Sequence, residues 1–96
     1  MEHLAKIELI GRVGVVNEHI VGNERNVRFS VAVDTVYRGG AGATVHTTWF
    51  SCSYWGNCDV VKGQDIHLEG RMVGNSYTDI EGKERQYLEV KVGRIW

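Results

Sequence analysis

Hydrophobic and polar residues alternate along most of this chain with a period of two. No run of a dozen residues has apolar positions spaced three and four apart, which is the pattern of an amphipathic helix. Between residues 4 and 16, one side of the alternation is apolar and consists of Ile7, Leu9, Val13 and Val15. The opposite side carries charged residues. This pattern predicts a half-buried β-strand at 4–16.

The same period predicts four more strands, at 27–34, 45–55, 64–78 and 87–95. Turn-forming residues predict loops at 17–26, 37–44 and 79–85, the last a hairpin connection built around Gly82. Glycines inside the strands, at positions 11, 14, 70 and 74, provide the local bends that a closed sheet needs. We therefore predict an all-β protein with one domain over residues 1–96, a five-stranded Greek-key barrel of the OB type.

Composition narrows the class of protein. The chain has 96 residues, of which 43% are hydrophobic, enough for one compact domain. A domain of this size buries only about 60–65% of its unfolded surface, so association with another subunit would stabilise it. Charges interrupt the first residues, and no segment approaches the roughly 20 apolar residues of a membrane span, so we expect a soluble, intracellular protein. The net charge is −1, and any nucleic-acid binding must therefore come from a local surface.

Residues that carry catalytic or metal chemistry are sparse. Cys52 and Cys58 are too few for a disulfide framework, and their spacing matches no zinc pattern. We expect two reduced structural thiols, with no metal and no cofactor. The four histidines show no HExxH spacing, and no glycine-rich loop opens a helix that could hold phosphate. The sequence therefore predicts a protein that is not an enzyme.

Large aromatic residues concentrate in one predicted strand, within the segment HTTWFSCSYWG at residues 46–56. Alternation puts on one side Thr47, Trp49, Ser51, Ser53 and Trp55. It puts on the other side, as lining of the barrel, His46, Thr48, Phe50, Cys52 and Tyr54. The two outward tryptophans fit two interpretations. They form a platform on which unpaired nucleobases stack, at about 1–3 kcal/mol per base, or they pack under loops or against another subunit.

Basic residues near these rings are the candidates for contacts with a phosphate backbone. They are Arg12, Arg28, Arg38, Arg71, Lys83 and Arg85. Any one of them is equally well explained as a solvated surface charge, so the hypothesis depends on the set. Glu8, Asp34 and Glu69 fall on the same side of the alternation as these arginines. We therefore expect modest affinity.

Five segments follow one another in the order IELIGRVG, NVRFSVAV, TTWFSCSYWG, KGQDIHLEGRM and YTDIEGKER. In this order and spacing they resemble the strands of bacterial-type single-stranded DNA-binding proteins, and the resemblance covers about Leu4 to Ile95. It implies an OB fold and sequence-independent binding of single-stranded DNA in replication, recombination or repair, in the cytoplasm and associated with the nucleoid. It also implies that bases stack on four aromatic residues, Trp49, Trp55, Tyr77 and Tyr37.

The chain departs from that family in two places. Its members usually have a helix of about a dozen residues between the third and fourth strands, whereas here Gly56 and Gly63 enclose only NCDVVK. We expect a turn or a single helical turn at 57–62. Family members also end in a flexible linker and an acidic tip that recruits other proteins. This sequence stops at Trp96 after its last predicted strand, so tail-mediated recruitment is not expected.

The family resemblance also bears on assembly and on the alternatives. Relatives form homotetramers built from two dimers, with first strands paired across a two-fold axis, and a free strand at 4–16 would be an exposed edge. We favour a homotetramer over a dimer. One alternative function is that of a tailless OB-fold dimer resembling primosomal replication proteins, which mainly bridges partner proteins. Another is an OB-fold interaction module without nucleic-acid binding.

Overall fold

The computed structural model describes all 96 residues, and they form five strands joined by short connections. The strands are β1 (Lys6–Val21), β2 (Glu24–Gly39), β3 (Gly42–Trp55), β4 (Asp65–Thr78) and β5 (Glu84–Ile95). They close into a barrel in the order β1-β2-β3-β5-β4, and β4 pairs with β1 to complete it. The pairing of β3 with β5 is parallel and all the others are antiparallel. The prediction of an all-β, five-stranded OB barrel is confirmed.

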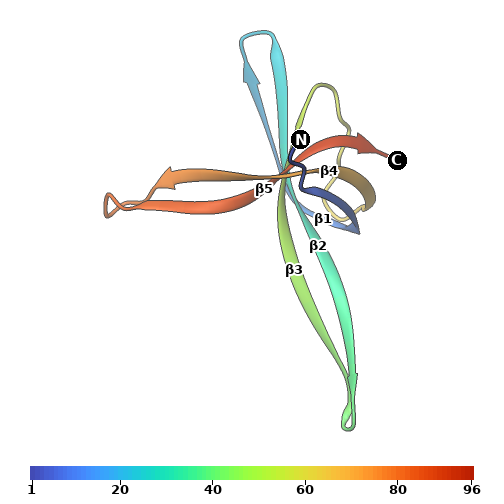
Figure 1. The fold of residues 1–96 in the computed structure, drawn as a ribbon. Coiled ribbons are helices and arrows are strands. Elements are labelled where there is room, and N and C mark those ends of the chain that lie inside the picture. The colour runs from blue at the N-terminus through green and yellow to red at the C-terminus, as the bar shows by residue number, and fades with distance from the viewer.

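Three hairpins project from the barrel in different directions (Figure 1). We call them the β1–β2 arm (residues 17–26), the β2–β3 arm (residues 34–47) and the β4–β5 arm (residues 74–88). The first two occupy the segments 17–26 and 37–44, which the sequence wrongly predicted as loops. Their strands stay paired up to two-residue turns. Both faces of these ribbons meet solvent, so no apolar alternation marks them as strands.

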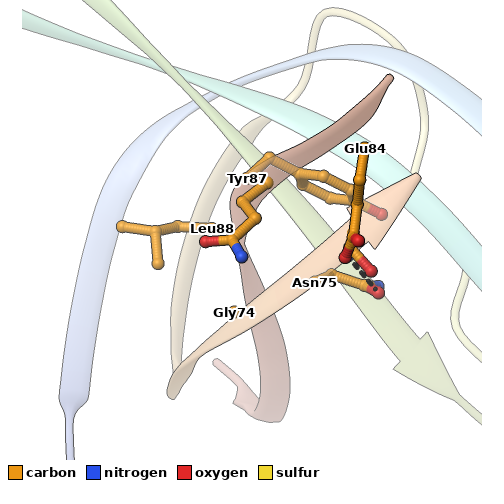
Figure 2. Close-up of a pocket in the computed structure, with 7 residues that line it drawn as sticks. Gly74, Asn75, Glu84, Tyr87 and Leu88 are labelled. Atoms are coloured by element: carbon orange, nitrogen blue, oxygen red, sulfur yellow. Dashed lines mark hydrogen bonds between the residues drawn. The ribbon is translucent and has the colours of Figure 1, made fainter. Parts of the chain in front are cut away.

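The hairpin connection predicted at 79–85 is present around Gly82, which has a φ of 80°, but it is shorter than predicted because β5 begins at Glu84. It closes the β4–β5 arm, in which Asn75 pairs with Tyr87 and Gly74 with Leu88 (Figure 2). At the tip, the Asp79 carboxylate accepts hydrogen bonds of 2.9 Å from the backbone N–H groups of residues 81 and 83. The aspartate side chain therefore organises the turn.

Residues 57–62 contain no helix, which agrees with the prediction that no more than a turn or a single helical turn fits there. The segment runs irregularly across one end of the barrel and buries Cys58. It is held by a backbone hydrogen bond of 2.8 Å from Gly63 to Val13, and by the Gln64 side chain, which accepts a 2.6 Å bond from the N–H of Val61. No helix long and apolar enough to cross a membrane is present in the structure.

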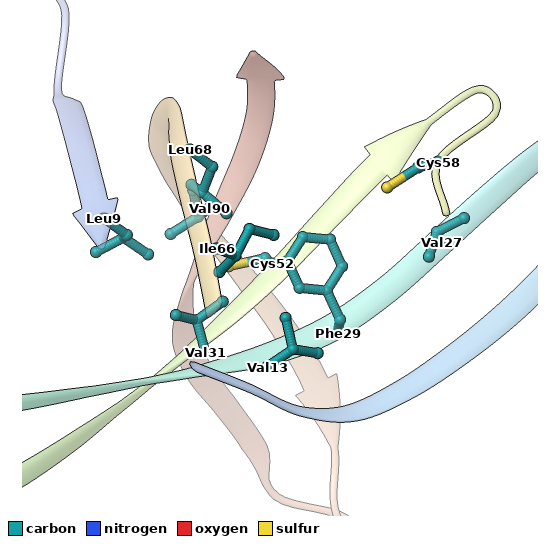
Figure 3. Packing of buried hydrophobic residues seen from close by; sticks show 10 residues of the cluster. All are labelled: Leu9, Val13, Val27, Phe29, Val31, Cys52, Cys58, Ile66, Leu68 and Val90. Carbon is teal, nitrogen blue, oxygen red and sulfur yellow. The ribbon is translucent and has the colours of Figure 1, made fainter. Parts of the chain in front are cut away.

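The core is a single cluster inside the barrel (Figure 3). Its ten buried residues are Leu9, Val13, Val27, Phe29, Val31, Cys52, Cys58, Ile66, Leu68 and Val90. Both cysteines are free and buried, as expected for structural thiols. Burial, and secondarily the charge of Glu89, raises the pKa of the Cys52 thiol to about 12. This thiol is therefore protonated at neutral pH.

A β-bulge corrects one prediction in β1. The register with β2 shifts between Val13 and Val16, because an extra residue is inserted next to Gly14. Beyond the bulge the alternation changes side, so Val16 packs against the core while Val15 is exposed. The sequence had placed Val15 on the core side.

The arms make the single chain unusually open. Its accessible surface is 7324 Å², whereas a compact monomer of 10.8 kDa is expected to expose about 5,500 Å². Its radius of gyration is 15.7 Å, against about 12 Å for a compact domain of this length. Only 14 of the 96 residues are buried. Much of this surface is available to a ligand or to another subunit.

Candidate nucleic-acid interface

Strand β3 presents its two tryptophans to solvent on the outer side of the barrel. Trp49 is 61% exposed and Trp55 50% exposed. On the opposite side of the strand Cys52 is buried, and Phe50 and Tyr54 pack against the core. The prediction that the tryptophans face outward is therefore confirmed, because alternation continues without interruption along this part of β3.

Three other residues of that strand differ from the prediction. Alternation put Ser53 on the outward side with the tryptophans, but it is only 3% exposed, and its hydroxyl has no hydrogen-bond partner. His46 and Thr48 do not line the barrel. They are exposed, because β3 has left the barrel at this point and belongs to the β2–β3 arm or its base.

The Trp49 ring reaches across β2 and rests on the β-bulge of β1. A Cβ atom added at Gly14 would lie 2.6 Å from Cζ3 of Trp49 and 2.6 Å from Oγ of Ser30. The same serine oxygen accepts a 2.9 Å hydrogen bond from the N–H of Val15. The absence of a side chain at Gly14 thus sets how closely the indole approaches the sheet.

A groove beside this ring contains the first of the predicted cations. Arg12 and Trp49 line it together, along with two carboxylates, Asp34 and Asp65. Thr47 donates a 2.6 Å hydrogen bond to Asp34. The structure therefore brings Arg12 to the ring, and it also places negative charge there, as the sequence indicated for Asp34.

Arg28 lies between the two tryptophans. Its register partner on β3 is Ser53, two residues before Trp55 and four after Trp49. Cross-strand partners share one face of a sheet, so the exposed guanidinium projects from the tryptophan face. Its Nε donates a 3.2 Å hydrogen bond to the side-chain oxygen of Asn26. This cation has the position expected of a phosphate contact between two stacked bases.

Tyr77 lies on the β4–β5 arm and is exposed. Its register partner is Arg85, whose Nε donates a 2.9 Å hydrogen bond to the Asp79 carboxylate. This hydrogen bond, assisted by the backbone donors of the turn, lowers the pKa of Asp79 below its ordinary value. Arg85 is thus already paired within the hairpin, while Lys83 lies in the turn itself.

Tyr37 and Arg38 lie far out on the β2–β3 arm. Counting cross-strand pairs from Trp49, which is opposite Ala32, places Arg38 on the tryptophan side of the ribbon and Tyr37 on the reverse side. The Tyr37 ring is exposed and meets His46 edge-on, with 6.4 Å between ring centroids. The structure therefore does not bring Tyr37 onto the same face as the tryptophans.

Comparison with known proteins identifies the family. A family model described as the single-strand binding protein family (SSB) matches residues 4–95. The chain belongs to this family. It is 30% identical over 108 residues to the mitochondrial single-stranded DNA-binding protein of Bos taurus, an alignment that spans 96% of this chain and 73% of the relative.

Two solved structures show the same fold as this SSB. One is the SSB of Plasmodium falciparum in complex with ssDNA, with a TM-score of 0.83, 21% identity, and coverage of 97% of this chain and 90% of that chain. The other is a small single-stranded DNA-binding protein from Streptomyces coelicolor, with a TM-score of 0.78, 20% identity, and coverage of 99% and 94%. The resemblance inferred from sequence is therefore confirmed. The contacts of individual residues with DNA stay predictions.

Two residues on the outer surface of this SSB escaped the sequence analysis, Lys91 and Tyr87. Consecutive register pairs run from Arg28 to Ser53, from Ser53 to Lys91, and from Lys91 to Arg71. Three cations thus form one row across β2, β3, β5 and β4. Alternation alone could not place Lys91 in that row, since the parallel pairing of β3 with β5 joins segments far apart in sequence.

The carboxylates that the sequence placed beside the arginines are partly compensated in this SSB. Glu69 forms a 3.0 Å ion pair with Lys6, and Glu8 lies 2.8 Å from Nε2 of His67. These contacts join β1 and β4. Arg12, Arg28 and Arg71 form no ion pair within 4.0 Å. They are available to an anionic ligand.

Proposed function

We propose that this SSB binds single-stranded DNA without reading its sequence and protects it without chemical change. Bases stack on Trp49, Trp55 and Tyr77, because every base has a π face that an aromatic ring can cover. The backbone phosphates are held by exposed cations. We assign this role chiefly to Arg12, Arg28 and Arg71, and secondarily to Arg38, Lys83 and Arg85, with Tyr37 as an accessory aromatic on the β2–β3 arm.

The observation that carries this proposal is the outward exposure of two tryptophans on one face of a barrel strand. A large aromatic residue left in water on a rigid strand is what a stacking platform requires. Trp55 follows Trp49 by six positions on β3, a distance of about 20 Å at about 3.3 Å per residue. Arg28 occupies the interval between them. Family membership supports single-stranded DNA as the ligand.

Titration with oligo-dT at low ionic strength tests the proposal, followed by tryptophan emission and by the anisotropy of a labelled oligonucleotide. We expect quenching in the wild type, and weaker binding by about five- to hundred-fold in Trp49→Ala or Tyr77→Ala. Trp49→Phe, which keeps a ring, should retain most of the affinity. Binding should also weaken with salt by about 0.7 log units per phosphate neutralised, per log unit of salt.

Trp96 provides the matched control. It is also exposed, but it stacks on His67 at 3.9 Å between ring centroids and carries the guanidinium of Arg94 at 4.4 Å from its ring. Its ring contacts His67 and Arg94 and none of the proposed stacking residues, so Trp96→Ala should bind as tightly as the wild type. Absence of quenching in the wild type, or equal losses from the Trp96 and Trp49 substitutions, would refute the proposal and favour an interaction module.

For assembly we propose a homotetramer, with a dimer as the alternative. Along Lys6–Gly11, β1 has a strand partner only in β4, so its other edge is free to pair with a second copy. Ile10, in the same segment, is exposed. Light scattering distinguishes four subunits from two, and a monomer at micromolar concentration would contradict both. We place the protein in the cytoplasm with the nucleoid, at single strands exposed during replication, recombination or repair.

A further inference from the structure

A groove opens on the outer face where the β4–β5 arm leaves the barrel. It has a volume of about 230 Å³, and its lining includes Arg28, Ser30, Ser51, Tyr87 and Glu89. The parallel pairing of β3 with β5 is limited to two residue pairs, at 52–53 and 90–91. Towards the start of β5 the two strands diverge, and no other strand fills the space beside Ser51. The volume is below the range of about 300–1,000 Å³ for drug-sized ligands, which favours a single planar ring as occupant.

Tyr87 connects this groove with the aromatic surface of the arm. Its side chain leaves β5 on the side opposite to that of Leu88 (Figure 2). Its ring centroid lies 5.9 Å from that of Tyr77, with an angle of 57° between the planes. Tyr87 is half-buried, so part of the ring meets solvent. The two tyrosines therefore form one continuous aromatic surface that runs from the arm into the groove.

Charges in the groove favour one orientation of a nucleotide. Arg28 supplies a cation on the β2 side. Glu89 is only 4% exposed, and its carboxylate accepts a 3.1 Å hydrogen bond from Asn75 and lies 3.8 Å from Nζ of Lys91. A phosphate near this buried carboxylate would be repelled. This distribution of charge favours a base inside the groove and a phosphate at its rim, next to the guanidinium.

We infer that Tyr87 and Arg28 form a nucleotide subsite between the β3 tryptophans and Tyr77. The base stacks on the Tyr87 ring, and the phosphate contacts Arg28. Single-stranded DNA then crosses from β3 to the β4–β5 arm over Ser51, without leaving the protein surface. This inference rests on the proposed function, and it adds an aromatic contact that the sequence analysis did not identify.

Substitution of Tyr87 tests the subsite. Tyr87→Ala should weaken binding of oligo-dT by about five- to hundred-fold, the loss expected for one stacked base. Tyr87→Phe keeps the ring and should stay within about two-fold of the wild type. Leu88→Ala is the matched control, because Leu88 is the next residue on β5, is exposed, and projects from the other side. It should bind as the wild type does.

A double-mutant cycle separates direct stacking from support of the neighbouring ring. If Tyr87 contacts its own base, Tyr87→Ala should weaken binding by about five-fold or more even when Tyr77 is already alanine. No further loss in that background would mean that Tyr87 only positions Tyr77, and would overturn the subsite. Arg28→Ala should lower the salt slope by about 0.7, and an unchanged slope would remove Arg28 from the subsite.

Photocrosslinking of the wild-type protein avoids any question of altered folding. After irradiation with oligonucleotides containing 5-iododeoxyuridine, mass spectrometry should find adducts on Tyr87 as well as on Trp49 or Tyr77. Adducts on the latter two without Tyr87 would overturn the subsite and leave the proposed function intact. If the wild type fails to bind oligo-dT at low salt, both fail. If Trp49→Ala weakens binding while Tyr87→Ala does not, only the subsite fails.

Discussion

Replacing Gly14 with alanine should weaken DNA binding although Gly14 itself offers nothing for DNA to contact. The backbone of Gly14 does not adopt a positive φ, so alanine introduces no strain in the main chain. Its new Cβ atom would, however, lie 2.6 Å from Cζ3 of Trp49, and two carbon atoms approach comfortably only to about 3.5–4.0 Å. The indole must therefore move outward by about 1 Å.

The binding free energy lost in Gly14→Ala cannot exceed the contribution of the Trp49 ring to DNA binding. Complete removal of Trp49 should cost about 1–3 kcal/mol per stacked base, and a ring displaced from its support retains part of that. We expect Gly14→Ala to cost about 1 kcal/mol of binding free energy, roughly a five-fold loss of affinity. The substitution also crowds Oγ of Ser30, which accepts the hydrogen bond from Val15. Loss of this hydrogen bond should lower the free energy of unfolding by about 1 kcal/mol.

The assay is the anisotropy titration with labelled oligo-dT, carried out in two backgrounds, together with thermal unfolding followed by circular dichroism. In the wild-type background Gly14→Ala should weaken binding. In the Trp49→Ala background it should have no further effect on affinity, because the ring that it displaces is absent. Equal losses in both backgrounds would mean that the glycine acts through the bulge or through Ser30. Unchanged affinity in the wild-type background would show that the supported position of the indole is irrelevant to binding.

Three further substitutions test the energetics of the fold. Ser53→Ala removes a buried hydroxyl without a partner and should raise the free energy of unfolding by about 1 kcal/mol. Ser30→Ala removes the acceptor of the hydrogen bond from Val15 and should lower the free energy of unfolding. Thermal unfolding that ranks the two variants in the opposite order would contradict this reasoning. The lowered pKa of Asp79 means that its ionised form stabilises the β4–β5 turn. This contribution is complete above the ordinary value of 3.8 and is lost as the pH falls through the lowered folded-state pKa. Asp79→Asn should therefore melt below the wild type at pH 7, and the difference should vanish in acid; a gap that persists there would show that the charge is not its cause.

The barrel could be predicted from sequence because each of its strands has one face buried in the core and one face in solvent. In β3 the outward direction of both tryptophans followed from alternation, since Cys52 and its neighbours fill the core on the other side. The arms could not be predicted in this way. A ribbon with solvent on both sides needs only ladder hydrogen bonds and a tight turn, such as the one at Gly22, where φ is 64°.

Alternation could not predict the side on which Val15 lies or the position of Tyr87, and each failure has a physical cause. A bulge inserts one residue, and it moved Val15 from the core side to the solvent side. The position of Tyr87 beside Arg28 depends on the parallel pairing of β3 with β5, which joins residues nearly forty positions apart in sequence. Local patterns specify which way a side chain points within its strand, but not which strand lies beside it.

The open shape of the chain links its stability with its function. The surface in excess of that of a compact monomer is about 1,800 Å², more than the roughly 800 Å² per partner that a standard protein interface buries. One subunit contact would therefore leave much of the excess uncovered. The three arms reduce the fraction of the single chain that is buried. Two of them carry Tyr77, Tyr87 and Arg38 away from the barrel. Subunit association can thus cover the free edge of β1 while the tryptophan face and the β4–β5 arm stay accessible to a nucleic-acid strand.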